Sequence, residues 1–223
     1  MKLGYRIFPS QRRVSEEVVE SYQGIPSSIV SDCMERLFAM DGAIRPFHPA
    51  PAMAGHAVTV HCPPGDNLVI QKAIEMAAPG DVLVINAGGT VTQAPVGEII
   101  VRNCIRKGVV GLVIDGAVRD SDMLPTLSIP VFAKGVTHRG CYKNGPGEIN
   151  VVIACGGVVV RPGDVVVGDC DGIVIVPFEE AENLLPKARE TLKKEQTLLE
   201  QIQQNTVDRS WVDAELREKG YSL

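Results

Sequence analysis

An arginine and an aspartate stand side by side at the end of an apolar run. Arg119 and Asp120 follow residues 109–114, which are too few for a typical helix and predict a buried β-strand. Open α/β sheets bind ligands beyond the carboxyl ends of their strands. The guanidinium offers a fixed cation for a carboxylate, and the carboxylate is a hard oxygen ligand for a divalent metal. The pair therefore predicts a site, with a plain surface ion pair as the alternative.

A second motif precedes this pair and points to anion binding. Residues 81–86 predict a strand, and residues 95–107 predict a helix that Gly108 closes. The first N–H groups of a helix have no partner within it and attract anions. Four candidate substrate-binding residues lie in or near that first turn: Gly97, Glu98, Ile99 and Ile100.

The spacing of the two motifs predicts that they meet. Twenty residues separate Glu98 from Arg119, which is about one helix plus one strand. A right-handed crossover of this length can return the chain to the same edge of the sheet. We expect an anion-binding helix end that faces an arginine and two carboxylates.

At this point the sequence resembles a known family, the RraA-like proteins, over roughly residues 18–177. The resemblance rests on several blocks in the same order and spacing: Pro79-Gly80-Asp81, Val96-Gly97-Glu98, Asp115-Gly116-Ala117-Val118-Arg119-Asp120 and Gly168-Asp169-Cys170-Asp171-Gly172. The family includes class II 4-hydroxy-4-methyl-2-oxoglutarate/4-carboxy-4-hydroxy-2-oxoadipate aldolases, which carry an acidic residue, twenty positions, then Arg-Asp. The acidic residue here is Glu98, where those aldolases more often have aspartate.

The resemblance implies an α/β fold, a β/β/α sandwich similar to swivelling domains, with a C-terminal helical extension. It divides the chain into a core of residues 1–177 and a helical extension of residues 178–223. The resemblance also implies a homotrimer or a hexamer, and we expect the extension to pack on a neighbouring subunit. Glu195 is then the acidic residue that would approach the adjacent site.

The resemblance also implies a chemistry, the release of pyruvate from a 4-hydroxy-2-oxo di- or tricarboxylic acid, with oxaloacetate decarboxylation as a side activity. Mg²⁺ or Mn²⁺ would be held directly by Asp120 and, through water, by Glu98 and Glu195. Arg119 would pair with the substrate carboxylate or the enolate oxygen, and the N–H groups near Ile99 and Ile100 would hold the carboxylate. A single protein carboxylate with retained waters is typical of Mg²⁺ rather than Zn²⁺.

Two alternatives remain beside this interpretation. A lysine could stabilise the enolate as a Schiff base, and Lys134 is the best placed of the lysines, without a visible activating partner. Some RraA-like proteins instead resemble the aldolases only in fold and act as protein-binding regulators of ribonuclease E. Retention of Glu98, Arg119 and Asp120 together favours the enzyme.

Bulk properties exclude other classes. The chain has 223 residues, 45% of them hydrophobic, so it can bury a full core. A formal net charge of −5 without a long basic run argues against a nucleic-acid partner. No apolar stretch approaches the roughly 20 residues of a membrane span. Six cysteines without metal-ligand spacing indicate free thiols, most of them buried, in a cytoplasmic protein.

The remaining pattern predicts the elements that must position these residues. Apolar spacing and end signals predict helices starting at Ser15-Glu16-Glu17 and spanning residues 27–38, 66–78 and 178–205. Strands are expected at residues 57–60, 131–133, 150–153, 157–160, 164–167 and 172–176. The short valine-rich strands after residue 130 suggest a compact sandwich or barrel.

Overall fold

The computed structural model describes residues 1–10, 14–49 and 51–223. Its helices are α1 (Glu16–Glu20), α2 (Ser27–Cys33), α3 (Leu68–Met76), α4 (Glu98–Lys107), the 3₁₀ helix η1 (Leu124–Thr126), α5 (Ala181–Gln203) and α6 (Ser210–Glu218). Its strands are β1 (Arg45–Pro46), β2 (Met53–His61), β3 (Asp81–Asn86), β4 (Gly111–Val118), β5 (Val131–Val136), β6 (Glu148–Ile149), β7 (Ile153–Cys155), β8 (Val158–Val160), β9 (Val165–Gly168) and β10 (Ile173–Val176).

One large sheet organises the molecule, with strand order β1-β5-β4-β3-β2-β9-β10 and β6 added beside β2. The strands β2, β3, β4 and β5 are parallel neighbours, whereas β1, β9 and β10 are antiparallel. Parallel neighbours need crossover connections, and α3 and α4 supply two of them. The carboxyl ends of the parallel strands therefore meet at one edge of the sheet.

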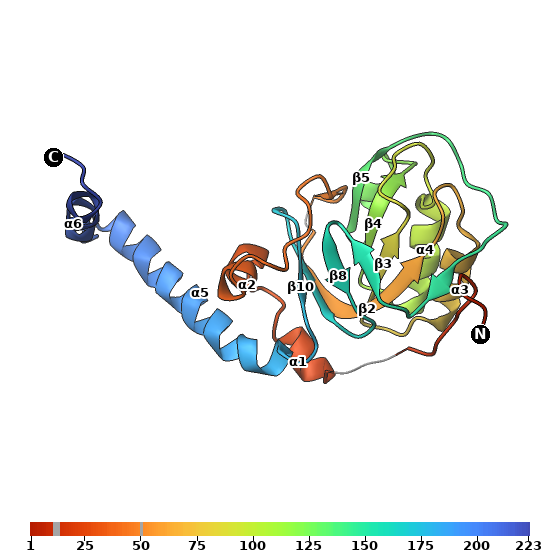
Figure 1. Ribbon diagram of the computed structural model, residues 1–223, viewed down its shortest axis with the longest axis horizontal. Helices are drawn as coiled ribbons and strands as arrows, with labels where there is room; N and C mark the ends of the chain where they lie inside the picture. The colour runs from red at the N-terminus through yellow and green to blue at the C-terminus, as the bar shows by residue number, and fades with distance from the viewer. Residues whose placement is uncertain (11–13, 50) are drawn as a thin grey trace.

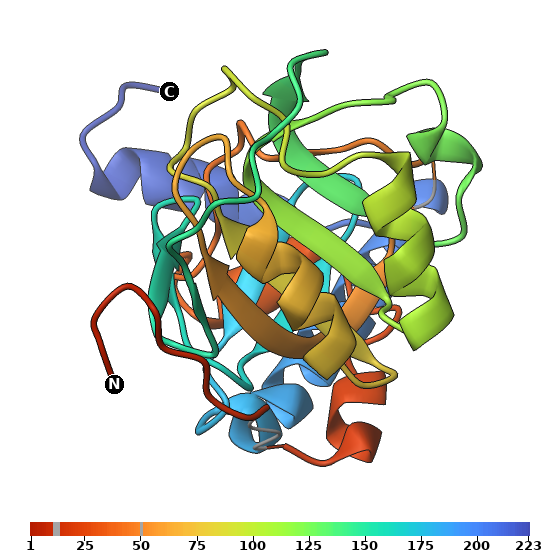
Figure 2. The same ribbon diagram turned by 90° about the vertical axis from the view of Figure 1, so that its right-hand side faces the viewer.

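All the helices that pack on the sheet cover the same face. Successive side chains of a strand point to opposite faces, so Leu83 and Ile85 pack under α3 and α4 while Val82 and Val84 face the other way. The helices α1, α2 and α5 cover the β9–β10 end of that helical face. Figure 2 shows α3 and α4 in front of the parallel strands.

The opposite face is covered by a second, small sheet. Strands β7 and β8 form an antiparallel hairpin, and its buried residues Ile153, Cys155 and Val160 pack on Val84 and Phe132 of the large sheet. The order hairpin, sheet, helices confirms the β/β/α sandwich (Figure 1).

The strands of residues 130–177 are divided between the two sheets of the sandwich. β5, β9 and β10 join the large sheet, and only β7 and β8 pair apart from it. The valine pattern predicts strands correctly but carries no information about their partners, because β2 pairs with β9 across more than a hundred residues.

Most predicted elements exist, with shifted ends. The strand expected at 109–114 extends to Val118, which places Arg119 immediately after it. The helix expected at 95–107 begins at Glu98, with Gly97 as N-cap, and ends at Gly108 in the left-handed conformation as predicted. The helix expected at 27–38 ends at Cys33, because Glu35 and Arg36 both have positive φ.

The C-terminal helix is anchored at its start and projects at its end. Ala181, Leu184, Leu185 and Ala188 are buried against α1, α2 and the outer strands, and the Tyr22 hydroxyl donates to the Ala181 carbonyl at 2.6 Å. Beyond this anchor, α5 and α6 extend away from the sheet (Figure 1). Within the described residues, no helix is long and apolar enough to cross a membrane.

Candidate functional site

Arg119 and Asp120 lie beside the start of α4, as the spacing of the two motifs predicts. A parallel bridge pairs Val96 with Val118, and the Arg119 N–H donates to the Val96 carbonyl at 3.0 Å. The segment before α4 therefore runs along the last residue of β4. This pairing brings the first turn of α4 next to the residues that follow the strand.

The Asp120 carboxylate caps the helix. Its Oδ2 accepts a hydrogen bond from the Glu98 N–H at 3.0 Å and lies 3.8 Å from Nε of Arg119. Asp120 itself has a φ of 57°, an uncommon conformation for a residue other than glycine. Its side chain is 41% exposed, so the carboxylate is held by the helix end and remains open to solvent.

Gly97 makes this approach possible. A Cβ atom at residue 97 would lie 2.5 Å from Oδ2 of Asp120 and 2.8 Å from Cγ of Arg119. Its φ of −151° is extended backbone that any residue adopts, so the requirement for glycine is one of space. The sequence motif Gly97-Glu98 is thus explained by what lies against it.

A cavity of about 200 Å³ opens between α3, α4 and the loop after β5. Its wall includes Gly97, Ile99 and Ile100 of the predicted anion-binding turn, together with Arg119 from the end of β4. The loop after β5 adds Gly140, Cys141 and the exposed Lys143. Two cationic side chains and a helix N-terminus around one cavity favour an anionic ligand.

The structure does not bring every predicted residue to this cavity through its side chain. The Glu98 carboxylate pairs with Arg102 one turn along α4, at 2.7 Å. The contact of Glu98 with Asp120 is made by the backbone N–H. Glu195 is exposed on α5, a helix that extends away from the sheet on the side opposite α4 (Figure 1). A role for Glu195 therefore requires a second chain, in keeping with the oligomer expected from the sequence.

Sequence reasoning missed two cavity residues of α3 and its approach, Asn67 and Gln71. The side-chain amide of Asn67 donates to the Pro95 carbonyl at 3.0 Å, while its buried Oδ1 has no hydrogen-bond partner in the described part of the chain. The same rule that pointed to Arg119 could have found Asn67, because both follow the carboxyl end of a parallel strand.

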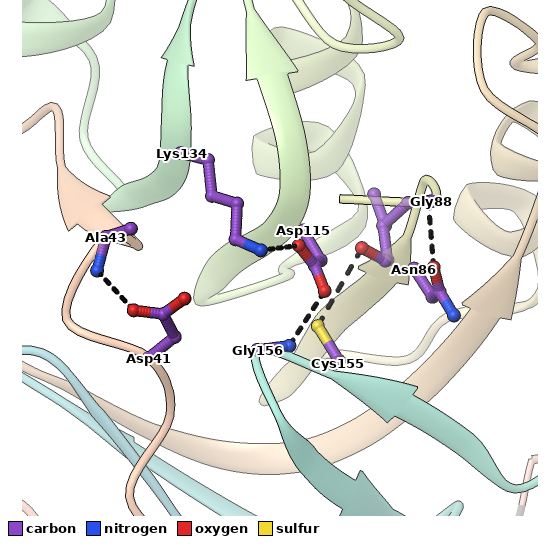
Figure 3. A network of polar contacts seen from close by, with 9 residues as sticks. Asp41, Ala43, Asn86, Gly88, Asp115, Lys134, Cys155 and Gly156 are labelled. Carbon is purple, nitrogen blue, oxygen red and sulfur yellow. Dashed lines mark hydrogen bonds and ion pairs between the residues drawn. The ribbon is translucent and has the colours of Figure 1, made fainter. Parts of the chain in front are cut away.

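Lys134 belongs to a different cluster, on the hairpin face of the sheet (Figure 3). Its Nζ lies 2.7 Å from Oδ1 of Asp115, whose Oδ2 accepts a hydrogen bond from the Gly156 N–H at 2.9 Å. The Asp115 carboxylate raises the pKa of Lys134 above its usual range. Lys134 therefore has a partner that the sequence did not reveal, but Asp115 stabilises the ammonium rather than the nucleophilic amine and so does not activate the lysine.

The cysteines behave as ordinary thiols. All six are free, and four of them are buried, as their apolar surroundings predict. Burial raises the pKa of Cys141, the one that lines the cavity, to about 11, so its thiol is neutral at physiological pH.

Comparison with known proteins agrees with this architecture. Residues 27–175 match the RraA-like family model, described as Aldolase/RraA. A Halalkalibacterium halodurans protein, which its name proposes to be a 4-hydroxy-4-methyl-2-oxoglutarate aldolase, is 39% identical over 78% of this chain and 82% of its own.

Solved structures show the same fold. An uncharacterised Pseudomonas syringae protein superposes with a TM-score of 0.80 at 24% identity, over 90% of this chain and 94% of its own. Streptomyces coelicolor RraAS2, described as an unusual member of the RNase ES inhibitor RraA protein family, superposes with a TM-score of 0.75 at 28% identity, over 84% of this chain and 99% of its own. The family model covers well over half of the sequence, and this chain is therefore a member of the RraA-like family.

Proposed function

We propose that this chain is a divalent-metal-dependent aldolase that releases pyruvate from a 4-hydroxy-2-oxo di- or tricarboxylic acid. The observation that carries the proposal is the placement of Arg119 and the first turn of α4 in the cavity wall, with the Asp120 carboxylate bonded to the start of that helix beside Arg119. Similarity to a relative that is named as such an aldolase supports the same reaction class.

The carboxylate of Asp120 fits a hard divalent cation. Its Oδ2 is fixed by the Glu98 N–H while the side chain stays open to solvent, and the Gly97 backbone leaves the space that a Cβ would fill. Within the described ranges, no group of three or more His, Cys, Asp or Glu side chains could hold a metal ion. One carboxylate completed by waters suits Mg²⁺ or Mn²⁺, whereas Zn²⁺ usually takes three or four protein ligands.

Each residue of the cavity edge then has a task. The N–H groups of Ile99 and Ile100 bind the carboxylate of the 2-oxo acid, because they lie in the unpaired first turn of α4. The Arg119 guanidinium neutralises the negative charge that develops on the pyruvyl oxygen. A bound divalent cation would supply further positive charge for the enolate that bond cleavage leaves. Glu98, whose carboxylate would have to leave Arg102, and Glu195 of a neighbouring chain would orient water beside it.

Loss of CO₂ from oxaloacetate leaves the same pyruvate enolate, so we propose oxaloacetate decarboxylation as a second activity of this site. The Schiff-base alternative is disfavoured, because Asp115 holds Lys134 in its charged form. The metal-dependent route needs no lysine.

The test is a coupled assay of pyruvate release with 4-hydroxy-4-methyl-2-oxoglutarate or oxaloacetate as substrate. We expect activity to vanish with EDTA and return with Mg²⁺ or Mn²⁺, and Asp120→Ala to lose the metal-dependent rate while it remains folded. Asp122→Ala removes an exposed carboxylate two residues further on and is the matched control. Pyruvate release by Asp120→Ala at the parent rate would overturn the site assignment.

The second candidate function is protein-binding regulation of ribonuclease E. The likeness to Streptomyces coelicolor RraAS2 favours it, because that protein is described as belonging to an RNase ES inhibitor family. A pull-down of the ribonuclease with this chain, run beside the pyruvate assay, separates the two. Capture of the ribonuclease without any turnover would support the regulator and contradict the aldolase.

A further inference from the structure

Asp66 is a buried carboxylate that accepts hydrogen bonds from backbone N–H groups near the cavity. Its side chain follows β2 and is 5% exposed. Oδ1 accepts from the Leu68 N–H at 2.9 Å, at the start of α3, and Oδ2 accepts from the N–H groups of Asn144 and Gly145 at 2.6 and 3.0 Å. One carboxylate thus joins the start of α3 to the loop after β5.

That loop is one wall of the candidate site. It includes Gly140, Cys141 and Lys143, which line the cavity opposite the first turn of α4. Further backbone bonds align it with the segment around Asp66: the Tyr142 N–H donates to the Gly65 carbonyl at 2.8 Å, and the Asn67 N–H donates to the Tyr142 carbonyl at 3.0 Å.

The next residue, Asn67, holds the other wall. Its side-chain amide donates to the Pro95 carbonyl at 3.0 Å, two residues before the Gly97 N-cap of α4. Two consecutive residues therefore hold the two sides of one cavity. Asp66 accepts hydrogen bonds from the loop after β5, and Asn67 donates one to the segment that leads into α4. A buried carboxylate that accepts several N–H bonds is costly to replace, since each donor would lose a charge-assisted partner.

We propose that Asp66 and Asn67 are a positioning pair that sets the separation of the two cavity walls. This separation determines which part of a substrate is accepted beyond the pyruvyl group that Arg119 and α4 bind. The inference rests on the proposed function for its substrate class, a 2-oxo acid with a remote second carboxylate. Neither residue belongs to the set that we assign to the pyruvyl end, so we expect their effect to fall on binding of the remote part.

Amide hydrogen exchange of the intact protein tests directly whether Asp66 holds the loop after β5. In Asp66→Asn, an amide replaces the second acceptor oxygen, and we expect amide exchange in residues 139–147 to rise about tenfold. Asp164→Asn is the matched control, because Asp164 is also buried and its carboxylate also accepts backbone N–H bonds, from Arg161 and Phe178, which belong to neither cavity wall. Unchanged exchange in residues 139–147 of Asp66→Asn would overturn the proposal.

Asn67→Ala gives a second variant in case Asp66→Asn does not fold. It removes only the bond to the Pro95 carbonyl, and we expect faster exchange in residues 93–97 without faster exchange in residues 161–165. Exchange that rises equally throughout the chain would show a general loss of stability and count against the pair.

Calorimetric binding in the presence of Mg²⁺ tests the selectivity without requiring turnover. Oxalate mimics only the carboxylate and enolate oxygens of the pyruvyl end, whereas 2-oxoglutarate adds a remote carboxylate. We expect Asp66→Asn to weaken the binding of 2-oxoglutarate about tenfold and the binding of oxalate less than about twofold. Equal weakening of both acids would overturn the proposal. Failure of the parent to bind either acid would instead contradict the proposed function, and the exchange result would then decide the role of the pair.

Discussion

At the scale of single residues, the site depends on close approach rather than on many ligands. Gly97 lets the Asp120 carboxylate and the Arg119 side chain lie directly against the first turn of α4. This contact explains why a charge pair with exposed side chains is held in one place, although exposed ion pairs are weak.

Gly97→Ala tests that contact. The added Cβ would meet Oδ2 of Asp120 at 2.5 Å, so Asp120 and Arg119 must shift, while the backbone is unstrained. We expect an intact fold and a fall of about a hundredfold in kcat/KM for pyruvate release. Gly42→Ala is the control, because a Cβ there meets its first neighbour only at 3.9 Å. Full activity of Gly97→Ala would show that the close approach is not needed.

Two experiments distinguish a structural role of Lys134, as the partner of Asp115, from a chemical role as a Schiff base. Lys134→Met leaves Asp115 buried without its cation, which we expect to lower the free energy of unfolding by about 3 kcal/mol in a urea titration. Borohydride reduction of the parent in the presence of pyruvate should add no mass to Lys134, because its ammonium is stabilised. A reduced pyruvyl adduct on Lys134 would reinstate the Schiff-base route.

Sequence patterns predicted the site residues that stand at the end of a strand or the start of a helix. Arg119, Asp120 and Gly97 were found because each lies at a strand end or a helix start, where local signals are strong. Asp66, Asn67 and the Asp115–Lys134 pair were missed as partners, because their contacts join segments that are distant in sequence. Nothing in the spacing of such residues records the register between β4 and β5.

At the scale of elements, type was predictable and boundaries were not. The helix α4 ends at Gly108 as predicted, since only a left-handed residue can close it there. Its start was placed too early, because Val96 pairs with Val118 and cannot join the helix. The strands after residue 130 were recognised, but their division between two sheets depends on long-range pairing.

An ion pair between the N-terminal segment and β6 predicts an acid response. The guanidinium of Arg6 donates to Glu148, with Nη2 and Oε2 2.9 Å apart, and lowers the pKa of Glu148 to about 2. A lowered pKa in the folded state means that the stabilisation is present above the usual glutamate pKa of about 4.3 and is lost as the pH falls toward 2.

Glu148→Gln should therefore flatten the pH dependence of stability in this window. We expect the unfolding free energy of the parent to fall more steeply from pH 5 to pH 2, by at most about 1.4 kcal/mol per pH unit for one proton. Urea titrations at several pH values measure the difference. Identical slopes in parent and variant would contradict the lowered pKa.

At the scale of the whole molecule, the projecting end of α5 exposes an apolar stripe. Leu198, Leu199 and Ile202 are exposed beyond the part of α5 that packs on α1 and α2. Residues three and four apart share one face of a helix, so these side chains form a continuous surface. Such a surface suits the homotrimer or hexamer that we propose, with Glu195 near its partner.

We therefore expect light scattering to give the mass of three or six chains. Leu198→Asp combined with Ile202→Asp should shift the mass toward a smaller species, because charges replace the apolar stripe. Gln201→Asp changes an exposed polar residue of the same turn and is the control. A monomeric parent would contradict the proposed oligomer and any role for Glu195 at a neighbouring site.

The central claim is that this site stabilises a pyruvate enolate with a divalent cation held at Asp120. The most direct measurement is the exchange of pyruvate methyl protons in D₂O, followed by NMR, with metal-stripped and Mg²⁺-reloaded protein. We predict that exchange stops on stripping, returns with Mg²⁺, and is absent in Asp120→Ala under both conditions. Exchange at the same rate with and without the metal would contradict the account.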